Sequence, residues 1–156
     1  MSRSYRSGEV SRTEERQLAV ASASLGPWRT AAAVGALGGG VSLGFGAVTG
    51  DFGLGVVAGA LSLALMLFFL VGGAGAALGG RGGAAADHRI RRWARSHPWQ
   101  VATVPAALLL VSDFLMRQIL TSEGFFGSLW DGLWRGAVVA GLIGLIGAMG
   151  GARRRG

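Results

Sequence analysis

Four long apolar segments alternate with polar segments along the chain. The apolar segments run from Trp28 to Thr49, from Phe52 to Ala74, from Trp99 to Leu120 and from about Ser128 to Met149. Each has the length of about 20 residues that an α-helix needs to cross about 30 Å of hydrocarbon. The pattern therefore predicts an all-α integral membrane protein, folded as a four-helix bundle.

The connections between these segments pair them into two transmembrane hairpins. Thr49, at the end of the first segment, together with Gly50 and Asp51 joins it to the second, which leaves room for nothing but a tight turn. A longer stretch, rich in glycine and then in arginine, separates the second segment from the third. The predicted organisation is a polar tail (1–26), a first hairpin (27–75), a basic loop (76–98), a second hairpin (99–150) and a basic tail (151–156).

The fourth helix is expected to begin before Gly136. A helix from Gly136 to Met149 would have a length of only about 21 Å, which is too short to span the hydrocarbon. The helix must therefore include Asp131 and Arg135. Ser128 and Asp131 indicate its start, because they place a hydroxyl cap and a carboxylate at the positive end of the helix dipole. An interfacial helix over Phe125 to Arg135 is an alternative.

The arginines predict the orientation. All 15 residues counted as Lys or Arg are arginine, and all but Arg117 and Arg135 lie in the polar segments or at their edges. By the positive-inside rule these segments, and with them both termini, are cytoplasmic. The flanks account for most of the net charge of +7, so the charge does not by itself indicate nucleic-acid binding. The absence of Lys and Asn beside abundant Gly and Ala is typical of a GC-rich genome, and it predicts an actinobacterial protein of the bacterial cell (inner) membrane.

The polar segments also suggest local structure and contacts. In the N-terminal tail, Ser11 and Glu14 have the spacing of a capping box, which predicts a short cytoplasmic helix. The basic loop and the C-terminal tail are expected to lie on anionic lipid headgroups or on a protein partner. The residues expected to make these contacts are Arg89, Arg91, Arg92, Arg95, Arg153, Arg154 and Arg155.

Two charged motifs lie inside or beside the outer half of the membrane in the second hairpin. Asp113 and Arg117 have i,i+4 spacing, and Asp131 and Arg135 repeat it, so each Asp can pair with its own Arg. If the hairpin turns near Gly124, Asp113 and Arg135 lie equally far from the turn on opposite sides, and so do Arg117 and Asp131. We therefore expect a network of four charges, each with one intrahelical and one interhelical partner.

This network has two interpretations. Charges inside a membrane need partners and often mark an ion or proton path. Balanced pairs, however, leave no unpaired carboxylate to carry a proton, which favours a structural clamp that fixes the register of the hairpin.

Glycines at i,i+4 spacing allow helix backbones to approach closely in a membrane. With 29 glycines in the chain, packing inside the bundle and association with another helix are equally compatible with the pattern. The glycines expected to pack are Gly35, Gly39, Gly40, Gly44, Gly55, Gly59, Gly141, Gly144 and Gly147.

No catalytic residues, metal ligands or cofactors are predicted. The chain has no cysteine, which excludes a catalytic thiol and a thiolate zinc site. Ser42 stands in a Gly-x-Ser-x-Gly pattern, but it lies in an apolar helix without a partner base. His88 and His97 have only Asp87 as a neighbouring acidic ligand, so neither a metal site nor an enzyme is expected.

Parts of the second half resemble a known group of proteins. These parts are His97-Pro98-Trp99, the stretch Ser128-Leu-Trp-Asp-Gly-Leu-Trp-Arg-Gly-Ala and the segment Gly-Leu-Ile-Gly-Leu-Ile-Gly before Arg153. They resemble small polytopic Streptomyces membrane proteins, among them the plasmid spread (Spd) proteins, over the part of the chain that begins shortly before His97. The resemblance implies an accessory of conjugative plasmid transfer.

Two functions follow as expectations. The first is a non-enzymatic membrane accessory or scaffold protein that acts with a partner complex or by self-association. The alternative is a small oligomeric transporter or pore that uses the Asp and Arg cluster.

Overall fold

A computed structural model describes residues 12–24, 26–51, 53–78, 88–120 and 124–152. This part of the chain is all helical and contains no strand, which confirms the predicted all-α class. The helices are α1 (Arg12–Ala23), α2 (Trp28–Thr49), α3 (Leu54–Ala77), α4 (His88–Ser96), α5 (Pro98–Leu120) and α6 (Phe125–Ala152).

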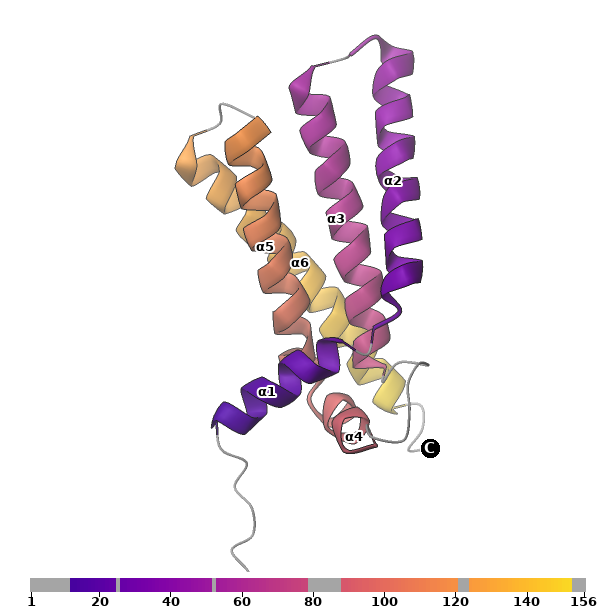
Figure 1. Ribbon diagram of the computed structural model, residues 1–156, viewed down its shortest axis with the longest axis vertical. Coiled ribbons are helices and arrows are strands. Elements are labelled where there is room, and N and C mark those ends of the chain that lie inside the picture. Colours follow the sequence, from indigo (N-terminus) through magenta and orange to yellow (C-terminus); the bar gives the residue numbers. More distant parts are fainter. Residues whose placement is uncertain (1–11, 25, 52, 79–87, 121–123, 153–156) are drawn as a thin grey trace, which may run out of the picture.

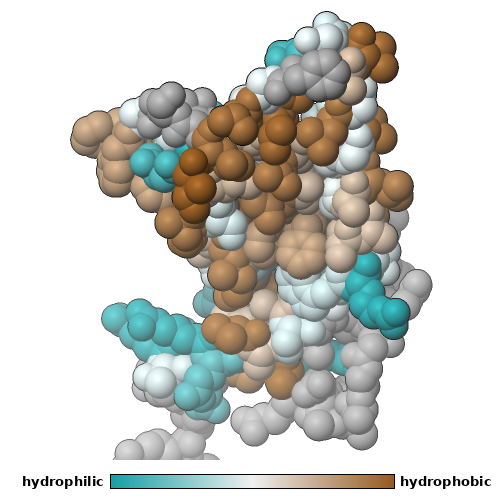
Figure 2. Space-filling view, turned by 45° about the horizontal axis from the view of Figure 1, so that its top comes forward, coloured by the Kyte–Doolittle hydropathy of each residue, from teal (hydrophilic) through white to brown (hydrophobic). Residues whose placement is uncertain are grey.

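Four of these helices, α2, α3, α5 and α6, are long and apolar enough to cross a membrane. Figure 2 shows hydrophobic residues over most of the bundle surface, whereas hydrophilic residues gather at the end where α1 lies. Such a distribution is typical of a protein whose surface faces lipid rather than water. The bounds of α2 are those predicted, and the other three spans differ from the prediction by a few residues at one or both ends.

The predicted start of the fourth helix is wrong. The helix begins at Phe125, before Ser128, and it runs without a break to Ala152. The N–H of Ser128 already donates to the carbonyl of Gly124 at 3.1 Å. The Ser128 side chain is buried, and its hydroxyl has no hydrogen-bond partner among the described residues. Ser128 is therefore an interior helix residue and not a cap. The helix begins at the residue where the alternative interfacial helix was expected to begin, but it is one continuous helix.

The helices form two hairpins that meet along α3 (Figure 1). Helix α2 packs along α3 and α5 packs along α6, while α3 also contacts both α5 and α6. Among the four long helices, α2 packs against α3 and not against α5 or α6. The buried core lies where the hairpins meet and includes Phe69, Val101, Leu109, Val139 and Ile143. Helix α3 is thus central, and α2 stands at the edge of the bundle.

Glycines shape the first hairpin in two places, at the end of α2 and where α2 packs against α3. Gly50 ends α2 with a φ of 78°, a left-handed conformation that favours glycine. Further along the hairpin, a Cβ added at Gly35 would lie 2.7 Å from the carbonyl oxygen of Ala64 in α3. Only glycine permits this close approach of α2 and α3.

Two short helices lie at the end of the bundle where α2 and α5 begin (Figure 1). Helix α1 contacts α3, α4 and α5, and it corresponds to the helix predicted in the N-terminal tail, although the proposed cap Ser11 lies outside the described residues. The indole N–H of Trp28 donates to the carbonyl of Ala23 at 3.0 Å, which ties the end of α1 to α2. In α4, the Trp93 ring stacks on the ring of His97, with centroids 5.0 Å apart.

Candidate functional site

The most distinctive polar site is a cluster of four charged side chains between α5 and α6. Asp113 and Arg117 come from α5, and Asp131 and Arg135 come from α6. We refer to these four residues as the charge cluster. The structure contains all four ion pairs expected from the spacing of the sequence.

Asp113 lies at the centre of the cluster and its side chain is fully buried. Arg135 donates from Nη1 to both carboxylate oxygens of Asp113, at 3.1 and 3.2 Å. Within α5, Nε of Arg117 lies 3.3 Å from Oδ2 of Asp113. One buried carboxylate therefore faces two guanidinium groups, which offsets the free energy of removing its charge from water.

Asp131 occupies the outer side of the cluster. Its Oδ2 lies 3.1 Å from Nη1 of Arg117 and 3.9 Å from Nη2 of Arg135. The side chain of Asp131 is 45% exposed, compared with 9% for Arg117 and 27% for Arg135. The cluster thus runs from a buried carboxylate to one that is open on one side.

The register of the hairpin explains this pairing. Asp113 and Arg135 are equally far from Gly124 along the chain, as are Arg117 and Asp131, so each pair lies at one depth once the helices run antiparallel. The two interhelical contacts of 3.1 Å are shorter than the intrahelical contacts of 3.3 and 3.9 Å. The cross-helix pairs therefore have the better geometry, as a clamp on hairpin register requires.

Ser62 of α3 joins the first hairpin to the charge cluster, a contact that was not predicted. Its buried hydroxyl donates a hydrogen bond to Oδ1 of Asp113. The positions of the helix ends in the structure account for this contact. Ser62 lies as far before the end of α3 at Ala77 as Asp113 lies after the start of α5 at Pro98. Because those two helix ends are at the same end of the bundle, both side chains lie at one depth.

The cluster is balanced in charge. It contains two carboxylates and two guanidinium groups, and Asp113 receives contacts from Ser62, Arg117 and Arg135. Each carboxylate has a cation within 3.3 Å. The arrangement is suited to holding three helices in place, since every charge has an opposite charge beside it.

The nine glycines expected to pack divide into two groups. A Cβ at Gly35 or Gly39 would contact α3, at Gly144 it would contact Trp99, and at Gly147 it would contact Pro98 and Ala77. These four glycines therefore pack inside the protein. The other five have open space where a Cβ would be built, and they are Gly40, Gly44, Gly55, Gly59 and Gly141.

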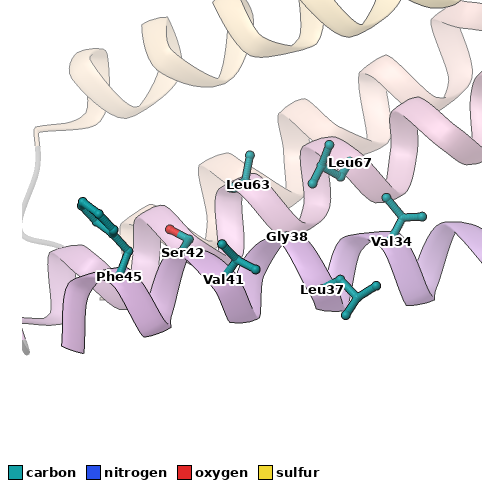
Figure 3. A pocket seen from close by; sticks show the side chains of 8 residues that line it. All are labelled: Val34, Leu37, Gly38, Val41, Ser42, Phe45, Leu63 and Leu67. Atoms are coloured by element: carbon teal, nitrogen blue, oxygen red, sulfur yellow. The ribbon is translucent and has the colours of Figure 1, made fainter. Parts of the chain in front are cut away.

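An open apolar groove of about 590 Å³ lies along the α2 and α3 pair. Figure 3 shows its lining, with Leu63 and Leu67 contributed by α3 and the other six residues by α2. Ser42 is among them, surrounded by aliphatic and aromatic side chains. A serine nucleophile would need a base such as histidine beside it. The described histidine side chain is that of His97, and it stacks on Trp93 of α4, away from this hairpin. The groove therefore presents apolar surface and not a serine with an adjacent base.

The predicted basic contacts lie partly within the described residues. Arg92 and Arg95 of α4 are exposed and Arg91 is half-buried. The side chain of Arg89 and the three arginines Arg153, Arg154 and Arg155 lie outside the described part. Across the described residues, no three His, Asp or Glu side chains come close enough to hold a metal ion.

Comparisons with known proteins identify no relative. No protein-family model matches the chain, and no curated protein or solved structure matches it.

Proposed function

We propose that the protein is a non-enzymatic scaffold or accessory subunit of the membrane that holds a partner helix against α2. One observation carries this proposal. The face of α2 that points away from α3 is lined by small residues and is covered by no described helix. Its exposed small residues are Ala33, Ala36, Gly40, Gly44 and Ala47.

Exposed apolar residues alone would indicate only contact with lipid. Small residues are different, because membrane helices associate by close backbone packing and lipid offers no such specific contact. Gly40 and Gly44 repeat at i,i+4 on this face, and large side chains such as Leu37 and Val48 flank it. A second helix that packed here would find the same kind of surface that α2 already offers α3 at Gly35 and Gly39.

The test is retention of partners by the tagged protein from native membranes in mild detergent, followed by mass spectrometry. We expect a fixed partner, or a second copy of the chain, to be retained by the wild type and lost in Gly44→Ile. Gly141→Ile is the matched control, because this glycine also has open space beside it but lies on α6. Equal retention by both variants would contradict docking on α2.

The proposal also includes the membrane, the orientation and the process in which the protein acts. We place the protein in the cell membrane of a bacterium, with the end that carries α1 and α4 in the cytoplasm. The resemblance of the second hairpin to plasmid spread proteins supports a role in conjugative plasmid transfer. A gene for a DNA translocase beside this one would support that role, and an isolated housekeeping locus would count against it.

A small transporter or pore is the second candidate, and one observation favours it. The charge cluster is open on the side of Asp131, so part of a polar site reaches the surface of the bundle. Flux through liposomes that is abolished by Asp113→Asn, and that does not respond to Arg92→Gln, would support this function. Absence of flux in the wild type would leave the scaffold as the better account.

A further inference from the structure

A polar groove lies between α1 and α5, apart from the charge cluster. It has a volume of about 290 Å³ and is lined by Arg12, Glu15, Arg16 and Ala19 of α1 and by Gln100 and Thr103 of α5. Helix α1 crosses the end of the bundle where α5 begins (Figure 1). Gln100 is the third residue of α5. The groove is therefore at the depth where an apolar helix leaves the hydrocarbon, which is also the depth of lipid headgroups.

The polar groups of this groove are not paired with one another. The side-chain oxygen Oε1 of Gln100 is buried and has no hydrogen-bond partner among the described residues. No ion pair joins Arg12, Glu15 or Arg16 to any other described residue. A buried amide oxygen without a donor is unfavourable, and proteins normally satisfy such groups. The groove thus offers the Glu15 carboxylate and two guanidinium groups to a ligand, and a rotation of the Gln100 side chain toward the groove adds Oε1 as a second acceptor.

The combination of two guanidinium groups and two oxygen acceptors indicates which ligand the groove can bind. Arg12 and Arg16 have i,i+4 spacing on one face of α1, where two guanidinium groups can bind one phosphate. A phosphate alone, however, would leave Oε1 of Gln100 without a donor and would lie near the Glu15 carboxylate. An ammonium group next to the phosphate supplies N–H donors to both acceptors. We propose that the groove binds the phosphoethanolamine headgroup of a phospholipid, with its phosphate at Arg12 and Arg16 and its ammonium at Glu15 and Gln100.

The surface above the groove fits the rest of such a lipid. Leu108, Val111 and Leu115 of α5 are about half exposed. They follow Gln100 at helical spacing and lie on the same side of α5, toward the middle of the membrane. An acyl chain attached to the headgroup would run along these side chains, so a phospholipid fits better than soluble phosphoethanolamine.

The purified full chain in detergent micelles allows a direct test by native mass spectrometry with titrated lipids. Phosphatidylethanolamine, phosphatidylcholine and phosphatidylglycerol with identical acyl chains are the probes. We expect phosphatidylethanolamine to bind at least about tenfold more tightly than phosphatidylcholine, whose trimethylammonium group has no N–H; one charge-assisted hydrogen bond contributes about this factor. Gln100→Leu should remove this preference. Gln118→Leu, which changes an exposed glutamine at the other end of α5, should keep it.

Several results would overturn the assignment. Equal binding of phosphatidylethanolamine and phosphatidylcholine by the wild type, which requires no variant to fold, would show that the ammonium is not recognised. Tighter binding of phosphatidylglycerol than of phosphatidylethanolamine would show that Arg12 and Arg16 recognise the anionic headgroup and that the ammonium contributes nothing. Equal effects of Gln100→Leu and Gln118→Leu would place the lipid elsewhere. Displacement by soluble phosphoethanolamine at the same concentration as the lipid would refute the contribution of the acyl chain.

Discussion

Neutralising Asp113 should destabilise the bundle far more than neutralising Asp131. Asp113→Asn keeps the shape of the side chain but removes the buried carboxylate charge that Arg117 and Arg135 both contact, whereas their contacts with Asp131 remain. Because Asp113 is fully buried and Arg117 is 9% exposed, the positive charge left on Arg117 stays inside the bundle. Removing one partner of a buried ion pair costs about 3 to 5 kcal/mol, and we expect a loss near the lower end because Asp131 still neutralises part of the charge.

Asp131→Asn is the matched control, since it removes the same charge from the same cluster. Asp131 is 45% exposed, and Arg117 and Arg135 both keep their contacts with Asp113. Ion pairs at an open protein surface contribute about 0 to 1 kcal/mol in water, and we expect a loss in this range because Asp131 lies within the first two turns of α6, near the end of the hairpin. The double variant Asp113→Asn with Arg135→Gln restores the balance of charge, and it should recover about 1 to 3 kcal/mol relative to the sum of the two single changes.

The measurement is the free energy of unfolding in mixed micelles, with a denaturing detergent as titrant and far-ultraviolet circular dichroism as the signal. The wild type, Asp113→Asn, Arg135→Gln, Asp131→Asn and the double variant form one series. Equal losses in Asp113→Asn and Asp131→Asn would refute the argument from burial. Strict additivity in the double variant would refute the pairing of Asp113 with Arg135.

Three further predictions follow from the fold. Gly35→Ala should destabilise the first hairpin by about 1 to 3 kcal/mol, because the added Cβ would lie 2.7 Å from a backbone oxygen of α3. Gly40→Ala is the control: its Cβ meets open space, so the change should be neutral or slightly stabilising in the same unfolding titration. Ser62→Ala should lower the free energy of unfolding by about 1 kcal/mol, because the hydrogen bond to Asp113 is lost. Ser42→Ala removes a hydroxyl from the apolar groove and should leave the free energy of unfolding unchanged. Because the chain has no cysteine of its own, Ser96→Cys should react with an impermeant maleimide only after cells are lysed, and reaction in intact cells would contradict the proposed orientation.

The sequence was sufficient to predict the charge cluster because its information is local to one hairpin. The i,i+4 spacing and the equal distances from Gly124 determine which charges meet once two helices turn back on each other. Ser62 was missed for the opposite reason. A single serine in an apolar helix has no periodic signal, and its contact with Asp113 depends on how the first hairpin docks against the second.

Helix starts and glycine faces were predictable only in part. Ser128 has the pattern of a cap, but Phe125 and Phe126 are apolar enough to extend the helix toward its N-terminus, and the resulting helix buries the serine. The i,i+4 glycine pattern is the same whether a helix or lipid lies beside it. Gly35 and Gly40 therefore look equivalent in the sequence, although one packs against α3 and the other meets open space.

The distribution of polar contacts explains why α2 is the helix best suited to a partner. The charge cluster joins α5 to α6, and Ser62 joins α3 to α5. Within the described residues, no side-chain hydrogen bond or ion pair joins α2 to the other three long helices, and close packing at glycines such as Gly35 holds it instead. Close packing depends on shape alone, so a second helix on the outer face of α2 would disturb no ion pair. If docking on α2 fails its test, the intact charge cluster will still account for the stability of the second hairpin.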